Sequence, residues 1–307
     1  MNIWQKTKKY LQWLCTPTAK KQAYLDNIIF QARQVPETAM LLDMAKENGI
    51  AVRFDSKMIF SSTAGVFTTY PENNVREITI NPSVAQEDWK AQTVLSHELR
   101  HMYQAMTRGE TPQTNDYTTY TPLTCLLIDR IKEADAAAYS AFHVERFLAV
   151  GNALCEVVQE KRTLQLSLDD LSALQKAVRE KLEKMQSAEE IIGIMSREFF
   201  DTLDILGNYD RKTMRRAHAF NTSAAAPERS HKLIAQSAAE IARSIRADVY
   251  LNLADETAFK ESILKGVKPE VQEAISLIDA FTAANDDQPE QKKTLRQKAR
   301  DLVYRHR

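Results

Sequence analysis

Glycine is scarce in this sequence, with 7 glycines among 307 residues, whereas helix-forming residues are plentiful. Glycine supplies the positive φ angles and close backbone approaches that β-sandwiches and glycine-rich nucleotide-binding folds need in number. A chain rich in alanine, leucine, glutamate, glutamine and lysine instead favours long helices. We therefore expect a mostly helical protein.

One stretch, residues 50–81, has the pattern of a sheet. Its β-branched and aromatic runs are short and are separated by turn-forming residues; they are Ile50–Phe54, Met58–Phe60, Ala64–Tyr70 and Arg76–Asn81. Short connections favour antiparallel neighbours. We therefore expect an α+β fold in which a small antiparallel sheet packs on the helix that follows it, with a helical extension after that.

Hydrophobic periodicity and end signals predict the helices on either side of this sheet. They are about Lys20–Gln34, Pro36–Asn48, Gln86–Met106, Cys125–Gly151, Leu168–Gln186, Glu189–Ile205, Ser230–Leu253, Glu256–Leu264, Glu270–Ala283 and Glu290–Val303. Composition suggests three regions: N-terminal helices at 1–49, a central domain at 50–222 whose core is 50–150, and a C-terminal helical region at 223–307.

The charges balance, with 41 basic and 41 acidic side chains, so no nucleic-acid partner is expected. Three cysteines without a repeated spacing indicate a reduced compartment, and we expect a cytoplasmic protein without a transmembrane segment. A first helix through Cys15 would be amphipathic. It either packs on its own domain or makes a weak contact with a membrane surface or a partner.

The sequence His97-Glu98-Leu99-Arg100-His101 is an H-E-x-x-H motif. Residues four apart lie on one face of a helix, so His97 and His101 can bind one metal ion together. Glu98 lies a hundred degrees round the helix and can act as a general base on a water at that ion. Zinc suits two imidazoles and a carboxylate.

The residues around the motif fit a helix with one buried side. Leu95, Leu99, Met102 and Met106 share a face opposite the two histidines, which leaves the histidine side free to hold a metal. The strand expected at 76–81 comes directly before this helix. The pattern therefore predicts an active-site helix packed on the sheet.

The third metal ligand is expected on the next helix. Glu133 shares a helical face with Ala136, Ala137 and Ser140, whose small side chains let two helices approach closely. Asp129 and Asp135 are the alternatives, because zinc accepts either carboxylate.

These two motifs resemble the gluzincin metallopeptidases, and most of all bacterial minigluzincin-like domains and metallopeptidase domains of unknown function. The resemblance covers about Ile50–Leu148. It implies one zinc ion held by His97, His101 and Glu133, a catalytic Glu98, and hydrolysis of peptide bonds.

The sequence departs from that family pattern at two positions. Arg100 stands where a small or uncharged residue is common, and Ala137 stands where several gluzincins have an acid that orients a histidine. Support for the histidines must then come from Asp129, Asp135 or a backbone carbonyl. Five side chains could stabilise the oxyanion: Tyr139, His143, Tyr209, His218 and His231.

The sequence thus predicts a zinc metallopeptidase that acts on a peptide or protein substrate or a small amide. The alternative is a non-catalytic helical interaction or sensor protein that retains a zincin-like metal site.

Overall fold

The computed structural model describes residues 3–61, 63–70, 72–84, 88–111, 116–161, 187–201, 207–222, 233–283 and 289–304. The chain forms two compact units, one of residues 1–113 and 136–195 and the other of residues 114–135 and 196–307. The division falls within one continuous helix, α6 (Pro122–Lys161). The three regions predicted from composition stay a prediction, and their boundary at Ser223 lies outside the described residues.

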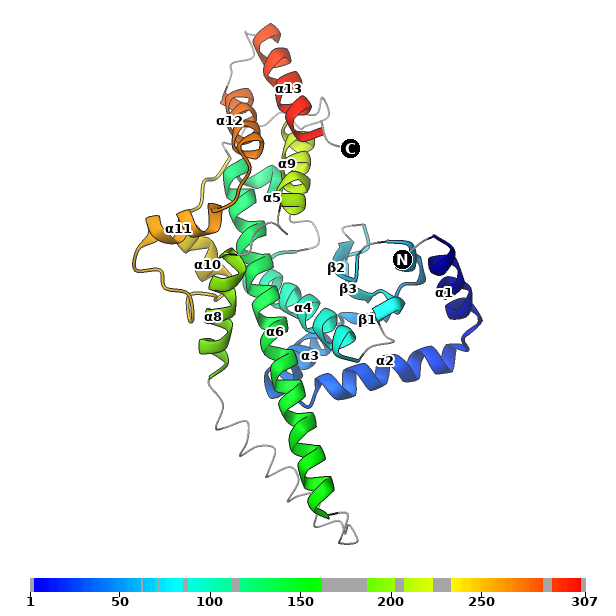
Figure 1. The fold of residues 1–307 in the computed structure, drawn as a ribbon. Helices are drawn as coiled ribbons and strands as arrows, with labels where there is room; N and C mark the ends of the chain where they lie inside the picture. The colour runs from blue at the N-terminus through cyan, green and yellow to red at the C-terminus, as the bar shows by residue number, and fades with distance from the viewer. Residues whose placement is uncertain are drawn as a thin grey trace. The chain divides into compact units, whose positions relative to one another are not determined.

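The first unit is helical with one small sheet, which confirms the expected α+β class (Figure 1). Its elements before α6 are α1 (Ile3–Cys15), α2 (Thr18–Ala32), α3 (Pro36–Glu47), β1 (Ala51–Phe54), η1 (Ser56–Phe60), β2 (Gly65–Tyr70), β3 (Val75–Ile80), η2 (Pro82–Val84) and α4 (Asp88–Thr107). The end signals read from the sequence hold for α3: Pro36 begins the helix, and Gly49 follows it with a φ of 64°.

The sheet is mixed, so the expectation of a purely antiparallel sheet was wrong. Its strand order is β1-β3-β2; β2 pairs with β3 antiparallel, but β1 pairs with β3 parallel. Residues 58–60, predicted as a strand, belong to the 3₁₀ helix η1. That helix separates β1 from β2, so β3 inserts between them after forming a hairpin with β2.

Helix α4 packs on this sheet with the face that the sequence predicted. It contacts β2 and β3 (Figure 1). Leu95, Leu99 and Met102 are fully buried, and Met106 is partly buried. The central strand β3 contributes Ile78 and Ile80, which are fully buried as well. Burial of these side chains fixes the rotation of α4 about its axis, and the opposite face carries the two histidines.

A buried polar cluster joins α4, α6 and α3. His143 of α6 lies 2.8 Å through Nδ1 from Thr38 Oγ1 and 3.0 Å through Nε2 from Gln92 Oε1. The Gln92 amide nitrogen donates to the Ile28 carbonyl, so the Gln92 amide oxygen faces His143 and accepts a hydrogen bond from its Nε2–H. Tyr139 lies 3.1 Å from Thr38. His143 is therefore held as a neutral imidazole.

The N-terminal helix α1 packs on its own unit. Tyr10 contacts Phe60 with ring centroids 4.9 Å apart, and Trp13 meets Phe54 edge to face at 5.0 Å. Leu11 and Leu14 remain exposed. Among the described residues, no helix is both long enough and apolar enough to cross a membrane.

The second unit is helical, and its described residues form two hydrophobic clusters. Besides the start of α6 it contains α5 (Asp116–Thr119), α9 (Gly207–Thr222), α10 (Ala238–Ser244), α11 (Glu256–Leu264), α12 (Pro269–Ala283) and α13 (Pro289–Tyr304), while α8 (Ala188–Asp201) begins in the first unit. One cluster lies among α6, α10 and α11, and the other among α6, α9, α12 and α13. Arg130 and Asp210 form a fully buried ion pair at 2.6 Å.

The helix predictions in the second unit hold in part. α11, α12 and α13 lie where they were expected. The helix predicted at 230–253 was wrong in extent: Ser237 and Glu240 form a capping box that starts α10, and Arg246 follows its end with a φ of 56°. α9 was not predicted, and the helix predicted at 168–186 lies outside the described residues.

Acid pH should weaken the first unit through His143. Burial lowers the pKa of His143 to about 4, whereas the unfolded chain titrates near 6.5. Between these values the unfolded state binds the extra proton, so stability is full above pH 6.5 and falls as the pH drops toward 4, by about 3 kcal/mol in total. Urea unfolding at a series of pH values measures this loss.

A His143→Gln variant is the matched comparison, since glutamine does not titrate in this range. Between pH 6.5 and 4, the free energy of unfolding of this variant should fall less steeply with pH than that of the parent. The difference in slope should correspond to about one bound proton. Equal slopes in the two proteins would contradict the assignment.

Candidate metal centre

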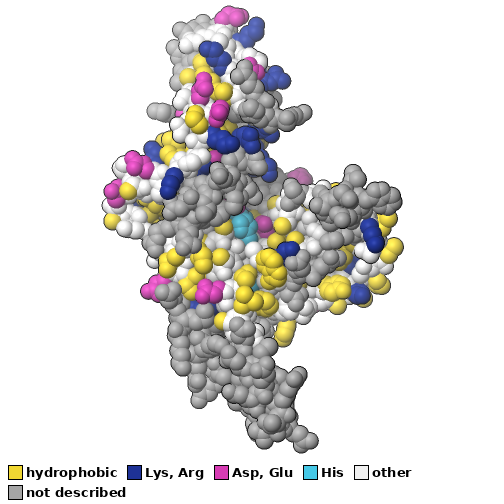
Figure 2. Space-filling model, viewed as in Figure 1, with side chains coloured by type: hydrophobic (Ala, Val, Ile, Leu, Met, Phe, Trp, Pro, Cys, Tyr) yellow, Lys and Arg dark blue, Asp and Glu magenta, His cyan; other side chains and the backbone are white. Residues whose placement is uncertain are grey.

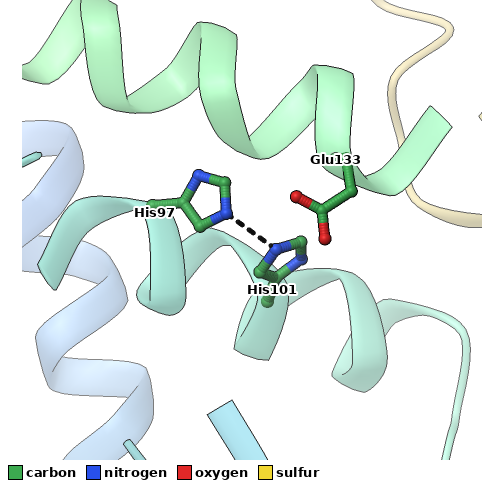
Figure 3. Close-up of side chains that lie close together, drawn as sticks. All are labelled: His97, His101 and Glu133. Carbon is green, nitrogen blue, oxygen red and sulfur yellow. Dashed lines mark hydrogen bonds between the residues drawn. The ribbon is translucent and has the colours of Figure 1, made fainter. Parts of the chain in front are cut away.

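Helix α4 brings the two histidines of the motif together. His97 and His101 lie one turn apart, and their Nε2 atoms are 3.0 Å from each other. The rings meet edge to face, with centroids 4.6 Å apart (Figure 3). Both side chains are partly exposed. Two ring nitrogens therefore converge on one point at the surface of the helix, as the spacing predicted.

Glu133 of α6 completes a group of three. One ligand atom each of His97, His101 and Glu133 lies within 4.8 Å of the others, and the Glu133 carboxylate points toward the histidines (Figure 3). In the space-filling view, histidine side chains are visible at the surface beside an acidic side chain (Figure 2). His97, His101 and Glu133 are each partly exposed, so the group can be reached from solvent.

The antiparallel packing of α4 and α6 produces this meeting. Gln92, near the start of α4, contacts His143, whereas His101, near its end, lies beside Glu133. Ala136, between the two contacts on α6, is fully buried. The small side chain lets the helices approach closely, as expected from the sequence.

Gln104 holds His101, a role that the sequence reading missed. Its Oε1 lies 2.9 Å from His101 Nδ1, and the residue is fully buried. An amide oxygen only accepts hydrogen bonds, so Nδ1 must carry the proton and Nε2 keeps its lone pair for a metal. The sequence carries a signal for this contact, because a glutamine three residues after the second histidine shares its helical face.

Glu98 is held by the sheet. Its side chain is 7 % exposed, and Oε2 accepts a hydrogen bond of 2.8 Å from the backbone N–H of Phe67 in β2. Glu98 therefore leaves α4 on a different side from its neighbour His97, toward the edge strand.

Asp129 and Asp135, the alternative third metal ligands, do not join the two histidines. Asp129 accepts hydrogen bonds from Thr213 and, at 3.1 Å, from Tyr117, and desolvation raises its pKa. Asp135 is buried. Neither belongs to the group of possible metal ligands found among the described residues.

Arg100 of the motif is also buried. Its guanidinium lies 4.7 Å from the Tyr103 ring and 5.3 Å from the Tyr139 ring. Arg100 therefore takes part in packing α4 against α6.

Three of the five candidate oxyanion donors are engaged in packing. Tyr139 and His143 are buried in the cluster around Thr38. His218 is buried in the second unit, 3.2 Å from the Arg296 carbonyl. The side chain of Tyr209 and all of His231 lie outside the described residues.

The donor set fits a divalent metal. Two imidazole nitrogens and one carboxylate are the protein ligands of catalytic zinc sites, which leave a further position for water. Gln104 fixes one histidine in the tautomer that metal binding needs. Partial exposure of all three side chains gives an ion access to the group.

Comparison with known proteins agrees with this chemistry. Residues 5–155 match the model of the "Putative metallopeptidase family (DUF6782)". The matched stretch, 151 of 307 residues, contains the motif on α4 and Glu133 on α6. No curated protein and no solved structure matches the chain. The family match supports a metallopeptidase and hence a metal-binding hydrolase.

Removing the Gln104 acceptor should weaken metal binding. A Gln104→Met variant keeps the size and helix propensity of the residue but leaves His101 free to turn and to protonate at Nε2. We expect the zinc affinity to fall about 10- to 100-fold, measured by competition with a chelating dye. Gln104→Glu, which restores an acceptor, should recover most of it. An unchanged affinity in Gln104→Met would remove Gln104 from the site.

Proposed function

We propose that this protein is a zinc-dependent metallopeptidase of gluzincin type. His97, His101 and Glu133 would hold one zinc ion, and Glu98 would act as the general base. The observation that carries the proposal is the convergence of two imidazole nitrogens and a carboxylate from two helices. Glu98 follows His97 in the sequence and does not belong to this group. The family match supports the same class of enzyme.

Zinc is the metal that this ligand set favours. Imidazole nitrogen suits zinc, whereas calcium and magnesium take oxygen ligands. When bound, zinc lowers the pKa of a coordinated water toward neutrality and polarises a carbonyl. The remaining chemistry falls to side chains of this chain.

Glu98 would accept the proton of the attacking water. The water oxygen then bonds to the carbonyl carbon, the C–N bond breaks, and the proton passes from Glu98 to the leaving nitrogen. A base must hold its place during this transfer, and the amide of Phe67 fixes Oε2 of Glu98.

The edge strand β2 supports a peptide as substrate. Among the described strands, β2 pairs with β3 alone, so the groups on its other edge, apart from the Phe67 N–H that donates to Glu98, can pair with an extended chain. The Asn81 N–H donates to the Ala64 carbonyl, so the even-numbered residues of β2 face β3 and the odd-numbered ones face the free edge. Glu98 contacts this same edge at Phe67.

Metal content tests the ligand set. The purified protein should carry about one equivalent of zinc, and His97→Ala should carry almost none, because two ligands rarely retain the ion. Glu133→Gln should lower the zinc affinity strongly as well. Atomic absorption on protein dialysed against a weak chelator gives the ratio. Equal zinc in the parent and in His97→Ala would end the proposal.

Hydrolysis tests Glu98. Glu98→Gln keeps the shape of the side chain but cannot accept a proton, so hydrolysis of a peptide library should fall by about 10²- to 10⁴-fold. The zinc content should stay at the parent value because Glu98 is not a ligand. Mass spectrometry of the library products measures the rate.

The same variant separates the enzyme from its alternative. A non-catalytic interaction or sensor protein would show no cleavage in the parent that depends on zinc and on Glu98. Parent protein that is loaded with zinc and cleaves nothing in the library would favour that alternative.

A further inference from the structure

Gly65, at the start of β2, differs from the turn glycines of this chain. Gly49 and Gly109 have positive φ angles, and a Cβ added to either would meet nothing within 4 Å. Gly65 shows the reverse: its φ lies outside the left-handed region, yet a Cβ there would meet three atoms of α4. The backbone conformation therefore accepts any residue, and only the nearness of α4 requires glycine.

The atoms that a side chain at position 65 would meet belong to Val94 and Glu98. An added Cβ would lie 2.5 Å from Val94 Cγ1, 3.0 Å from Glu98 Cγ and 3.1 Å from Glu98 Oε1. Contacts this short force a displacement, because protein interiors have little spare volume. The Glu98 carboxylate thus lies against the backbone of β2 where no side chain intervenes.

A second contact from the same strand fixes the carboxylate. The N–H of Phe67 donates to Glu98 Oε2 at 2.8 Å. Phe67 lies on the free edge of β2, so this N–H is not needed by the sheet. Gly65 provides space on one side of the Glu98 side chain and Phe67 provides a donor for it, two residues along the same edge.

We propose that Gly65 and the backbone amide of Phe67 are positioning residues for Glu98. They hold its carboxylate against the edge of β2. The proposal rests on the assignment of Glu98 as general base for its catalytic consequence, but the contact itself can be tested without zinc or substrate.

Amide hydrogen exchange at Phe67 tests the contact. An N–H on the free edge exchanges quickly unless an acceptor protects it. In the parent, the Phe67 amide should therefore exchange more slowly than that of Thr69, which lies on the same edge two residues on. Glu98→Ala leaves the backbone unchanged and should speed exchange at Phe67 by about tenfold or more, the effect of losing one hydrogen bond to a charged group. Thr69 serves as the internal reference.

Gly65→Ala tests whether Glu98 needs the space that the absent side chain of Gly65 leaves. The added methyl should displace Glu98, so exchange at Phe67 should rise as in Glu98→Ala while the zinc affinity stays at the parent value. The kcat for peptide hydrolysis should fall at least about tenfold with little change in KM, because the base is misplaced and the ligands are not. Combining Gly65→Ala with Glu98→Gln should lower kcat no further than Glu98→Gln alone.

Gly151→Ala is the matched control. Gly151 lies within α6, and a Cβ there would meet nothing within 4 Å. Its alanine variant should leave the exchange of Phe67, the zinc affinity and kcat unchanged, because alanine suits a helix better than glycine.

The outcomes separate the two proposals. Unchanged Phe67 exchange in Glu98→Ala, or Gly65→Ala with the kcat of the parent, would overturn the positioning role. Full hydrolysis by Glu98→Gln would instead overturn the catalytic role of Glu98 and leave the exchange result standing. A Gly65→Ala protein that fails to fold leaves the decision to Glu98→Ala, whose backbone is that of the parent.

Discussion

The close antiparallel packing of α4 and α6 is the constraint on which the candidate site depends. Gln92 and His143 meet in a buried hydrogen bond, and this contact sets the register in which His101 lies beside Glu133. A slip of one helical turn would move Glu133 by about 5.4 Å, which exceeds the spread of the ligand group. Among the described residues, the one group of possible metal ligands takes side chains from both helices. The polar contact in the core therefore contributes to the geometry at the surface, about three turns away.

The local part of this site could be predicted from the sequence, because its geometry follows from the helical repeat. His97 and His101 share a face whatever surrounds them, and Leu99 between them marks the buried side. Glu133 could be predicted from the sequence too, since small neighbours on its helical face indicate close packing of two helices. The Phe67 amide was not, because a backbone donor has no signature in the side-chain pattern and reaches Glu98 only through tertiary packing.

The parts of the fold that the sequence reading missed also have physical reasons. The direction of β1 depends on which strand lies beside it. A strand was expected at 58–60, but these residues form η1, and the strand beside β1 is β3, which runs parallel to it. The start of α10 is set by the capping box of Ser237, a stronger boundary than the hydrophobic pattern across 230–253. α9 is strongly polar, and most of its described buried residues are polar too: beside Met214 and Ala217 it buries Asp210, Thr213, His218 and Asn221. Few apolar residues therefore mark its buried face in the sequence.

Three carboxylates near the motif in space or in sequence differ in what surrounds them, and this favours one of them as the candidate third ligand. Asp129 lies one turn before Glu133 on α6, but Thr213 and Tyr117 already donate to it. Glu98 lies next to His97 in the chain, but the edge strand takes its carboxylate. Glu133 is the one of the three that points toward the histidines. Zinc accepts aspartate and glutamate alike, so the partners of each carboxylate, rather than the residue type, single out Glu133 as the candidate ligand.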